Sequence, residues 1–193
     1  TPLSWYRGEA HFMLGHLEEA FRDFRKANQQ HPNHIYVLNN LATSYELKGD
    51  HARAKDLYLR ALDIFPEFED ALLNLTAFYY NETTLDSAII MLSKIPLSSE
   101  NPRYTEFRTT VLERKLVYMV DSSEEQFISG SVGRIKNDEQ WTLKVFEQAV
   151  GSQNDFESEV YNEVIYLLES VDSTITHEEA IKLRNRFNLE SYE

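Results

Sequence analysis

Apolar residues in the first hundred positions recur with the period of α-helices, in segments separated by short breaks. One such helical face holds Leu38, Leu41, Ala42 and Tyr45, and the next holds Ala54, Leu57, Tyr58, Ala61 and Ile64. Gly49 and Asp50 separate these faces, since glycine supplies the left-handed residue that ends a helix and aspartate caps the following one. Pro66 stops the second helix. The pattern predicts a helical hairpin over residues 35–68.

The hairpin pattern repeats at an offset of 34 residues. Equivalent positions hold Gly15 and Gly49; Ala20, Ala54 and Ala88; Ala27 and Ala61; Pro32 and Pro66; Asn40 and Asn74; and Tyr45 and Tyr79. Small residues recur as Gly8, Ala42 and Thr76, and bulky ones as Phe24, Tyr58 and Leu92. We interpret the recurring alanines and tyrosines as packing residues, because helices approach closely at small side chains and large ones fill the remaining space. They are Ala20, Ala54, Ala88, Tyr45 and Tyr79. The units lie at 1–34, 35–68 and 69–102, and the third has Thr83 in place of the turn glycine.

The residues after the repeats show no period of 34. Residues 103–120 suit one more helix, which we expect to cap the repeats, because the end of a repeat array must be covered. Residues 121–137 are rich in serine and glycine, so we predict a linker or loop there. Residues 138–193 are expected to form a helical extension of shorter helices.

The repeat length, the small and large positions and the closing proline resemble the tetratricopeptide repeat (TPR) family. The resemblance is strongest over residues 1–68 and fades after residue 95. It implies an all-α fold: an α–α superhelix of three TPR helix pairs, with the capping helix and the helical C-terminal extension. It also implies protein binding in a concave groove lined by the first helix of each pair.

Charge and composition narrow the choice of partner. The net charge is −13, which disfavours nucleic acid and anionic membrane surfaces. Residues 121–193 carry sixteen acidic against six basic side chains, so most of that charge lies after the repeats. No stretch is apolar enough to insert in a membrane.

The sequence offers no catalytic or cofactor chemistry. There is no cysteine, which removes thiolate metal sites and cysteine nucleophiles. The six histidines do not have metal-ligand spacing, and neither a nucleophile elbow nor a phosphate-binding loop is present. We therefore expect no catalytic residue, no metal and no cofactor, and a protein that is not an enzyme.

The family resemblance assigns partner-binding positions to the first helix of each unit. The candidate residues are Trp5, Glu9, Phe12, Tyr36, Asn39, Asn40, Thr43, Leu73, Asn74 and Tyr80. Family members that clamp a C-terminal carboxylate use lysine and arginine in the groove, whereas Glu9 and Asp70 stand there in this sequence. Other members bind an extended peptide through a ladder of asparagines, which Asn40 and Asn74 resemble. Two readings stay open: these amides contact a ligand, or they brace neighbouring helices.

A finer resemblance links the runs RGEAHFMLGHLEEAFRDFRKA, HPNHIYVLNNLATSYELKGD and FEDALLNLTAFYYN to the C-terminal TPR segment of bacterial O-antigen ligase or polymerase membrane proteins. It implies a soluble tail on the outer side of the inner membrane of a protein that handles surface polysaccharide; without that parent, a cytoplasmic adaptor is expected. The alternative function is an accessory domain that binds glycan directly through its aromatic side chains.

Overall fold

The structure is a computed structural model that describes residues 2–119 and 132–151, together with the single positions 165, 166, 178, 181 and 185. All regular structure in these described parts is α-helical, as the repeat pattern predicts. The chain divides into two compact units, one holding the residues up to Thr83 and the other most of those that follow. None of the described helices is long and apolar enough to cross a membrane.

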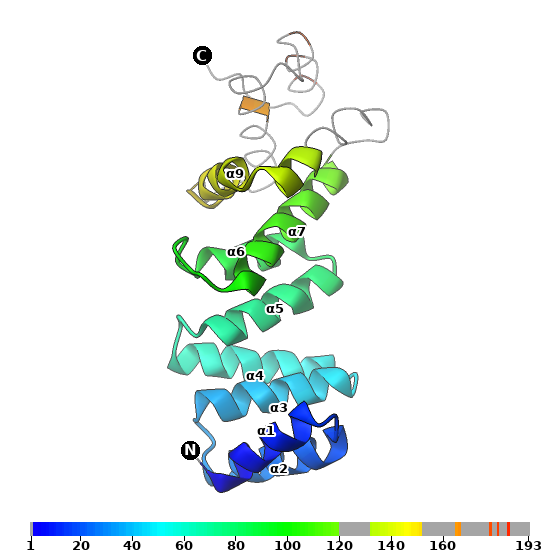
Figure 1. The fold of residues 1–193 in the computed structure, drawn as a ribbon, viewed down its shortest axis with the longest axis vertical. Coiled ribbons are helices and arrows are strands. Elements are labelled where there is room, and N and C mark those ends of the chain that lie inside the picture. Colours follow the sequence, from blue (N-terminus) through cyan, green and yellow to red (C-terminus); the bar gives the residue numbers. More distant parts are fainter. Residues whose placement is uncertain are drawn as a thin grey trace. The chain divides into compact units, whose positions relative to one another are not determined.

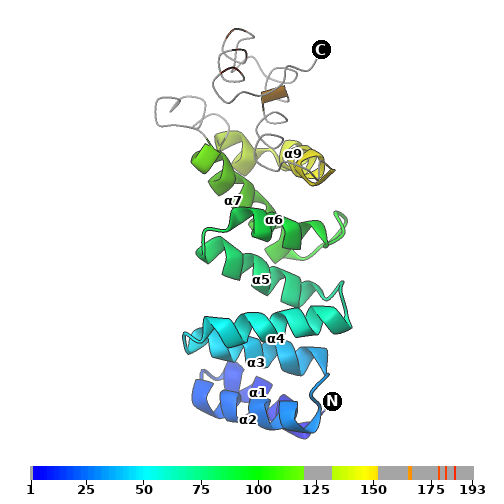
Figure 2. The ribbon, with the colours of Figure 1, turned by 180° about the vertical axis from the view of Figure 1, so that it is seen from behind.

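The first unit contains two helical hairpins and a further helix. Its elements are α1 (Leu3–Met13), α2 (Leu17–Gln30), α3 (Ile35–Leu47), α4 (His51–Ile64) and α5 (Glu69–Asn81). The pairs α1–α2 and α3–α4 are antiparallel and stack on one another (Figure 1), and the view from behind shows the same order (Figure 2). Helix α3 also touches α5 directly, and α2 packs against α3.

The conserved small and large positions of the repeat form the core of this unit. Ala20, Phe24, Ala54 and Tyr58 have no exposed surface. Gly8 is the closest approach, because a Cβ atom on it would lie 2.6 Å from the Phe24 ring. The interpretation as packing residues is confirmed for Ala20, Ala54 and Ala88, which are fully buried, whereas Tyr45 and Tyr79 are only half-buried.

The turns inside the hairpins share one backbone conformation. Gly15 and Gly49 have φ angles of +74° and +76°, in the left-handed region where glycine is favoured. Asp50 caps α4 by accepting a hydrogen bond from the Arg53 amide at 3.2 Å, as the sequence predicts. Thr83 takes the same left-handed conformation, with φ +59°, although it is β-branched. The third turn therefore keeps the geometry of the first two without their glycine.

The second unit contains α6 (Leu85–Ser93), α7 (Pro102–Met119) and α9 (Glu139–Gly151). Helix α7 packs against α6, and α9 packs against both. A buried lysine, Lys115, pairs with Asp86 on α6 at 2.7 Å, and the rings of Tyr104 and Phe146 lie 6.4 Å apart. The expected helix at 103–120 corresponds to α7. The expected third repeat is divided, since α5 belongs to the first unit and α6 to the second.

The prediction of a linker over residues 121–137 is wrong for its last part, because residues 132–137 are helical. Ile135 is buried, and its carbonyl accepts a hydrogen bond from the Thr142 hydroxyl at 2.8 Å. Asp138 then caps α9 by accepting from the Trp141 amide at 2.9 Å. One buried isoleucine outweighs the loop-like composition of this stretch. The rest of that linker, and most of the extension beyond residue 151, lie outside the described residues.

Candidate partner-binding face

Helices α1, α3 and α5 bring most of the predicted binding residues onto one surface of the first unit, called here the α1–α3–α5 face. The predicted residues that belong to it are Trp5, Glu9 and Phe12 from α1, Tyr36, Asn40 and Thr43 from α3, and Asn74 and Tyr80 from α5, with Asn39 of α3 buried directly beneath them. Contacts between these helices, described below, show that the residues of the first two repeats adjoin one another.

Aromatic rings form a cluster near the start of this face. The ring centroids of Trp5 and Tyr36 lie 6.2 Å apart, and Tyr36 meets Phe68 edge to face at 5.1 Å. Tyr36 keeps 47% of its surface exposed, whereas Phe68 is buried. The indole nitrogen of Trp5 is buried and has no hydrogen-bond partner among the described residues. Since tyrosine and tryptophan supply much of the energy of protein interfaces, this cluster suits a partner's contact point.

A chain of polar hydrogen bonds crosses the three helices beside these rings. Asn74 donates to the side-chain oxygen of Asn39 at 3.0 Å, and Asn39 donates to that of Asn40 at 3.3 Å. Asn40 in turn donates to the Glu9 carboxylate. These side chains come from α5, α3 and α1, so they tie neighbouring repeats together. Two of the asparagines thus brace neighbouring helices, which is one of the two roles that the sequence left open. Asn74 bonds Asn39 and not Asn40, which is its equivalent in the preceding repeat.

The Glu9 carboxylate ends this chain in a half-buried position. Burial raises its pKa above the ordinary value, because removing a carboxylate from water disfavours the charged form. The hydrogen bond from Asn40 acts in the opposite direction and is the smaller effect. No cation pairs with Glu9 within the described part of the chain.

A second set of polar contacts involves Thr43, Tyr58 and Glu46. The hydroxyl oxygens of Thr43 and Tyr58 are 2.9 Å apart, and Tyr58 donates to the Glu46 carboxylate at 3.0 Å. Tyr58 is a buried core residue of α4, and its hydroxyl group holds the side chains of Thr43 and Glu46 in place through these contacts. Glu46 thus has a neutral donor, and no cationic partner occurs among the described residues.

The remaining predicted residues differ in accessibility. Phe12 is half-buried, with its ring centroid 6.5 Å from that of Phe24, and Tyr80 is also half-buried. Leu73 is fully buried, so it packs in the core and offers no surface to a partner. It shares its repeat position with Trp5 and Asn39, and Asn39 is buried as well. The family resemblance therefore predicts Leu73 as a partner-binding residue, whereas the structure buries it in the core.

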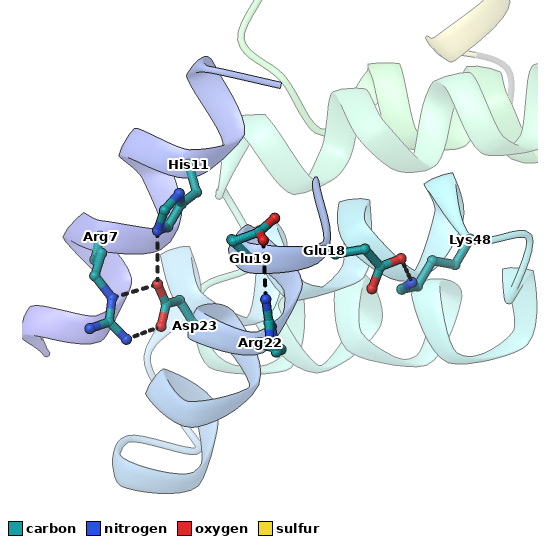
Figure 3. A network of polar contacts seen from close by, with 7 residues as sticks. All are labelled: Arg7, His11, Glu18, Glu19, Arg22, Asp23 and Lys48. Atoms are coloured by element: carbon teal, nitrogen blue, oxygen red, sulfur yellow. Dashed lines mark hydrogen bonds and ion pairs between the residues drawn. The ribbon is translucent and has the colours of Figure 1, made fainter. Parts of the chain in front are cut away.

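A small pocket of about 90 Å³ lies where the end of α3 meets the α1–α2 turn. Its lining is Phe12, Leu17, Ser44, Leu47, Glu18 and Lys48. Glu18 and Lys48 form an ion pair at its edge (Figure 3). Of the apolar side chains in this lining, Leu17 and Leu47 are exposed, and Met13 and Leu14, which lie at the end of α1, are exposed as well.

The sequence analysis did not predict a charge cluster between α1 and α2, in which one carboxylate is buried and its cationic partners are partly exposed. Asp23 is buried on α2 and accepts from the Arg7 Nε atom at 2.7 Å, with His11 Nε2 3.9 Å away (Figure 3). The hydrogen bond from Arg7 holds the pKa of Asp23 below its ordinary value. Arg7 and His11 are four residues apart, so they share a helix face and converge on one carboxylate. This contact joins the two helices and leaves the α1–α3–α5 face unaffected.

Metal-binding geometry is not found in the described residues, where no three histidine, aspartate or glutamate side chains gather around one point. The ring centroids of His11 and His16 are 5.7 Å apart, and no third metal-ligating side chain joins them in the described part of the chain. A wider, open pocket of about 810 Å³ adjoins Tyr6, Arg7 and His31 at the other end of α1 and contains none of the predicted binding residues.

Stacked antiparallel helix pairs, left-handed turn residues and buried alanines define the first unit as a helical-hairpin repeat. Two family models, each described as tetratricopeptide repeat, match residues 3–67 and residues 45–109. Residues 3–109 therefore belong to the tetratricopeptide repeat family. A comparison with curated proteins gives no match. Tetratricopeptide repeats generally mediate protein–protein interaction or scaffolding and are typically non-catalytic, so the fold implies a protein partner.

Proposed function

We propose that this chain is a non-catalytic interaction module that binds an extended peptide segment of a partner along the α1–α3–α5 face. The observation that carries the proposal is the combination of the exposed Tyr36 ring with the adjoining polar chain on the same helices. An extended peptide presents alternating N–H and C=O groups, which side-chain amides can match with both a donor and an acceptor.

The polar chain leaves capacity for such a ligand. An amide side chain has two donors and an oxygen with two lone pairs. Within the described residues, Asn40 uses one N–H toward Glu9 and one lone pair toward Asn39. Its second N–H and second lone pair remain for a peptide backbone. Bracing the helices and contacting a ligand are therefore compatible roles, with the bracing bonds holding the amide in position.

The proposal is tested by panning a random 12-residue peptide library on the immobilised chain. Tyr36→Ala removes the exposed ring, and Leu59→Ala removes a comparably exposed apolar side chain from α4 as the matched control. We expect enriched peptides to bind the wild type and Leu59→Ala alike, and to bind Tyr36→Ala about tenfold more weakly. Failure to enrich any peptide, or equal binding to all three proteins, would contradict the proposal.

The glycan alternative rests on the same aromatic side chains, which can stack on sugar rings. We expect no sugar to bind more tightly than the millimolar range, because the amide chain matches a peptide backbone. Titration calorimetry with oligosaccharides measures this directly. A ligand with micromolar affinity would favour the glycan-binding function.

The finer resemblance to the tail of an O-antigen ligase or polymerase is a separate proposal about the parent protein. It predicts that an antibody against this chain detects a band much larger than 22.6 kDa that stays in the membrane pellet after an alkaline wash. A soluble band near the mass of this chain would refute it and leave a free adaptor.

A further inference from the structure

We propose, building on peptide binding by the α1–α3–α5 face, that this face selects segments in which an aliphatic side chain is flanked by lysine or arginine. The aliphatic side chain enters the pocket beside Phe12 and Leu47, and the cations meet Glu9 and Glu46. The proposal rests on the shape of that pocket and on the charges around it.

The pocket has the size of a single side chain. Its volume is about 90 Å³. Small-molecule sites are several times larger, at about 300–1,000 Å³. Its lining combines the apolar side chains of Phe12, Leu17 and Leu47 with Ser44 and the Glu18–Lys48 ion pair. This volume favours a single small side chain over a nucleotide or a sugar ring.

The position of the pocket places it on the peptide path. On α1, Glu9 and Phe12 are three residues apart and share a face. On α3, Asn40, Thr43 and Leu47 follow one another at helical spacing. Because Asn40 bonds Glu9, these two stripes lie next to each other. A segment that follows the polar chain from α5 toward α1 therefore ends at the pocket.

Exposed apolar side chains occur in the pocket lining and at the end of α1, which precedes Leu17 in the sequence. Met13 is 85% exposed and Leu14 69% exposed, and Leu47 is exposed at 58%. These residues sit in and beside the first hairpin turn; the equivalents of Met13 and Leu14 in the next turn are Leu47 and the charged Lys48. Clustered exposed apolar side chains mark interaction sites, and methionine adapts to partners of different shape.

The charges around the pocket favour a partner segment with a positive charge. The nearby cations are already paired, Lys48 with Glu18 and Arg22 with Glu19. Glu9 and Glu46 have only neutral donors among the described residues, a side-chain amide and a phenol respectively. Two carboxylates thus remain without a cation on the helices that line the pocket. A ligand that brings lysine or arginine supplies the missing charge, and an acidic ligand is repelled.

The experiment uses the panning described above with two further pairs of variants. Leu47→Ser opens the pocket, and Leu59→Ser is its control on α4. Glu46→Gln removes a carboxylate from the face, and Asp63→Asn removes an exposed one from α4 with the same change in net charge. Circular dichroism melts of all four variants establish that they are folded before binding is compared.

We expect the enriched peptides to share an aliphatic residue within two positions of lysine or arginine. The most enriched peptide, labelled with fluorescein, should bind Leu47→Ser about tenfold more weakly and Glu46→Gln about two- to fivefold more weakly, with both controls unchanged. Its affinity should fall as salt rises, since exposed charges are screened.

The other outcomes separate this inference from the function on which it rests. Enriched peptides that are acidic or neutral, yet still depend on Tyr36, would overturn the charge selectivity and keep peptide binding. The absence of any peptide that depends on the α1–α3–α5 face would overturn both. A dimer in analytical ultracentrifugation that Leu47→Ser dissociates would identify a second copy of the chain as the occupant and would also overturn the inference.

Discussion

Replacing Thr83 by glycine should stabilise the chain, although the substitution removes a side chain. Thr83 has a φ angle of +59° in the turn after α5, where its equivalents are Gly15 and Gly49. Its side chain is exposed, so no buried contact is lost when it is removed. A β-branched residue in the left-handed region is strained, because its Cβ atom approaches the following carbonyl oxygen.

The expected gain follows from two opposing terms. The left-handed conformation costs a non-glycine residue about 1–2 kcal/mol. Glycine gives up part of this advantage, because it adds about 0.4–1 kcal/mol of conformational entropy to the unfolded chain. The difference is a stabilisation of about 0.5–1 kcal/mol. For a chain of this size that corresponds to a rise in Tm of about 1–4 °C.

Thermal melting of Thr83→Gly beside the wild type measures this shift. The reverse change, Gly49→Thr, is the matched control, since it places the same residue in an equivalent turn of the chain. It should lower the Tm by a similar amount. An unchanged or lower Tm for Thr83→Gly, together with a neutral Gly49→Thr, would refute the argument from backbone strain.

Three further predictions concern contacts inside the first unit. Gly8→Ala should destabilise the chain by about 1–2 kcal/mol, because its Cβ atom would stand 2.6 Å from the Phe24 ring, and Phe24→Leu should partly rescue it in urea melts. Asp23→Asn should be less stable than the wild type at neutral pH, because it loses the carboxylate that pairs with Arg7. Since the pKa of Asp23 in the folded chain lies below the ordinary 3.8, this stability difference should persist above pH 3.8 and vanish as the pH falls through the folded pKa. Urea midpoints of both proteins measured across that pH range test this. Asn40→Ala with Asn74→Ala should weaken peptide binding and lower the Tm by a few degrees without loss of the helical signal, and complete unfolding in circular dichroism would mean that these amides serve the fold alone.

The repeat could be predicted from the sequence because it depends on local, periodic features. Ala20 and Ala54 are buried where the offset of 34 residues places them, and Gly49 and Asp50 end and begin helices as their chemistry dictates. These properties follow from backbone conformation and close packing, which each repeat reproduces. The conformation of Thr83 is less predictable, because the surrounding turn holds it against the preference of threonine.

The candidate face was predicted only in part, because it depends on how each helix is rotated. The sequence identifies Asn40 and Asn74 as equivalent, but not that Asn74 bonds Asn39 across the helices. It also places Leu73 on the face, although the packing closes that position. Successive residues of a helix point about 100° apart, so neighbouring positions can lie one in the core and the other on the surface. The periodicity of the sequence does not determine the rotation of each helix about its axis.

The residues 132–137 illustrate a different limit. Serine and glycine around them favour a loop by composition, yet the segment is helical because Ile135 is buried and hydrogen bonds run on into α9. A tertiary contact of one apolar side chain overrides a weak local preference. Such contacts join residues that no short sequence pattern connects.

The central claim, that a peptide binds along the α1–α3–α5 face, is tested most directly by mapping amide chemical shifts in ¹⁵N-labelled protein as the most enriched peptide is added. The account predicts the largest changes at the side-chain amides of Asn40 and Asn74 and at the backbone amides around Tyr36 and Leu47. Residues of α4 such as Leu59 should change little. Changes concentrated on α2 and α4, with the asparagine side-chain signals unmoved, would contradict it.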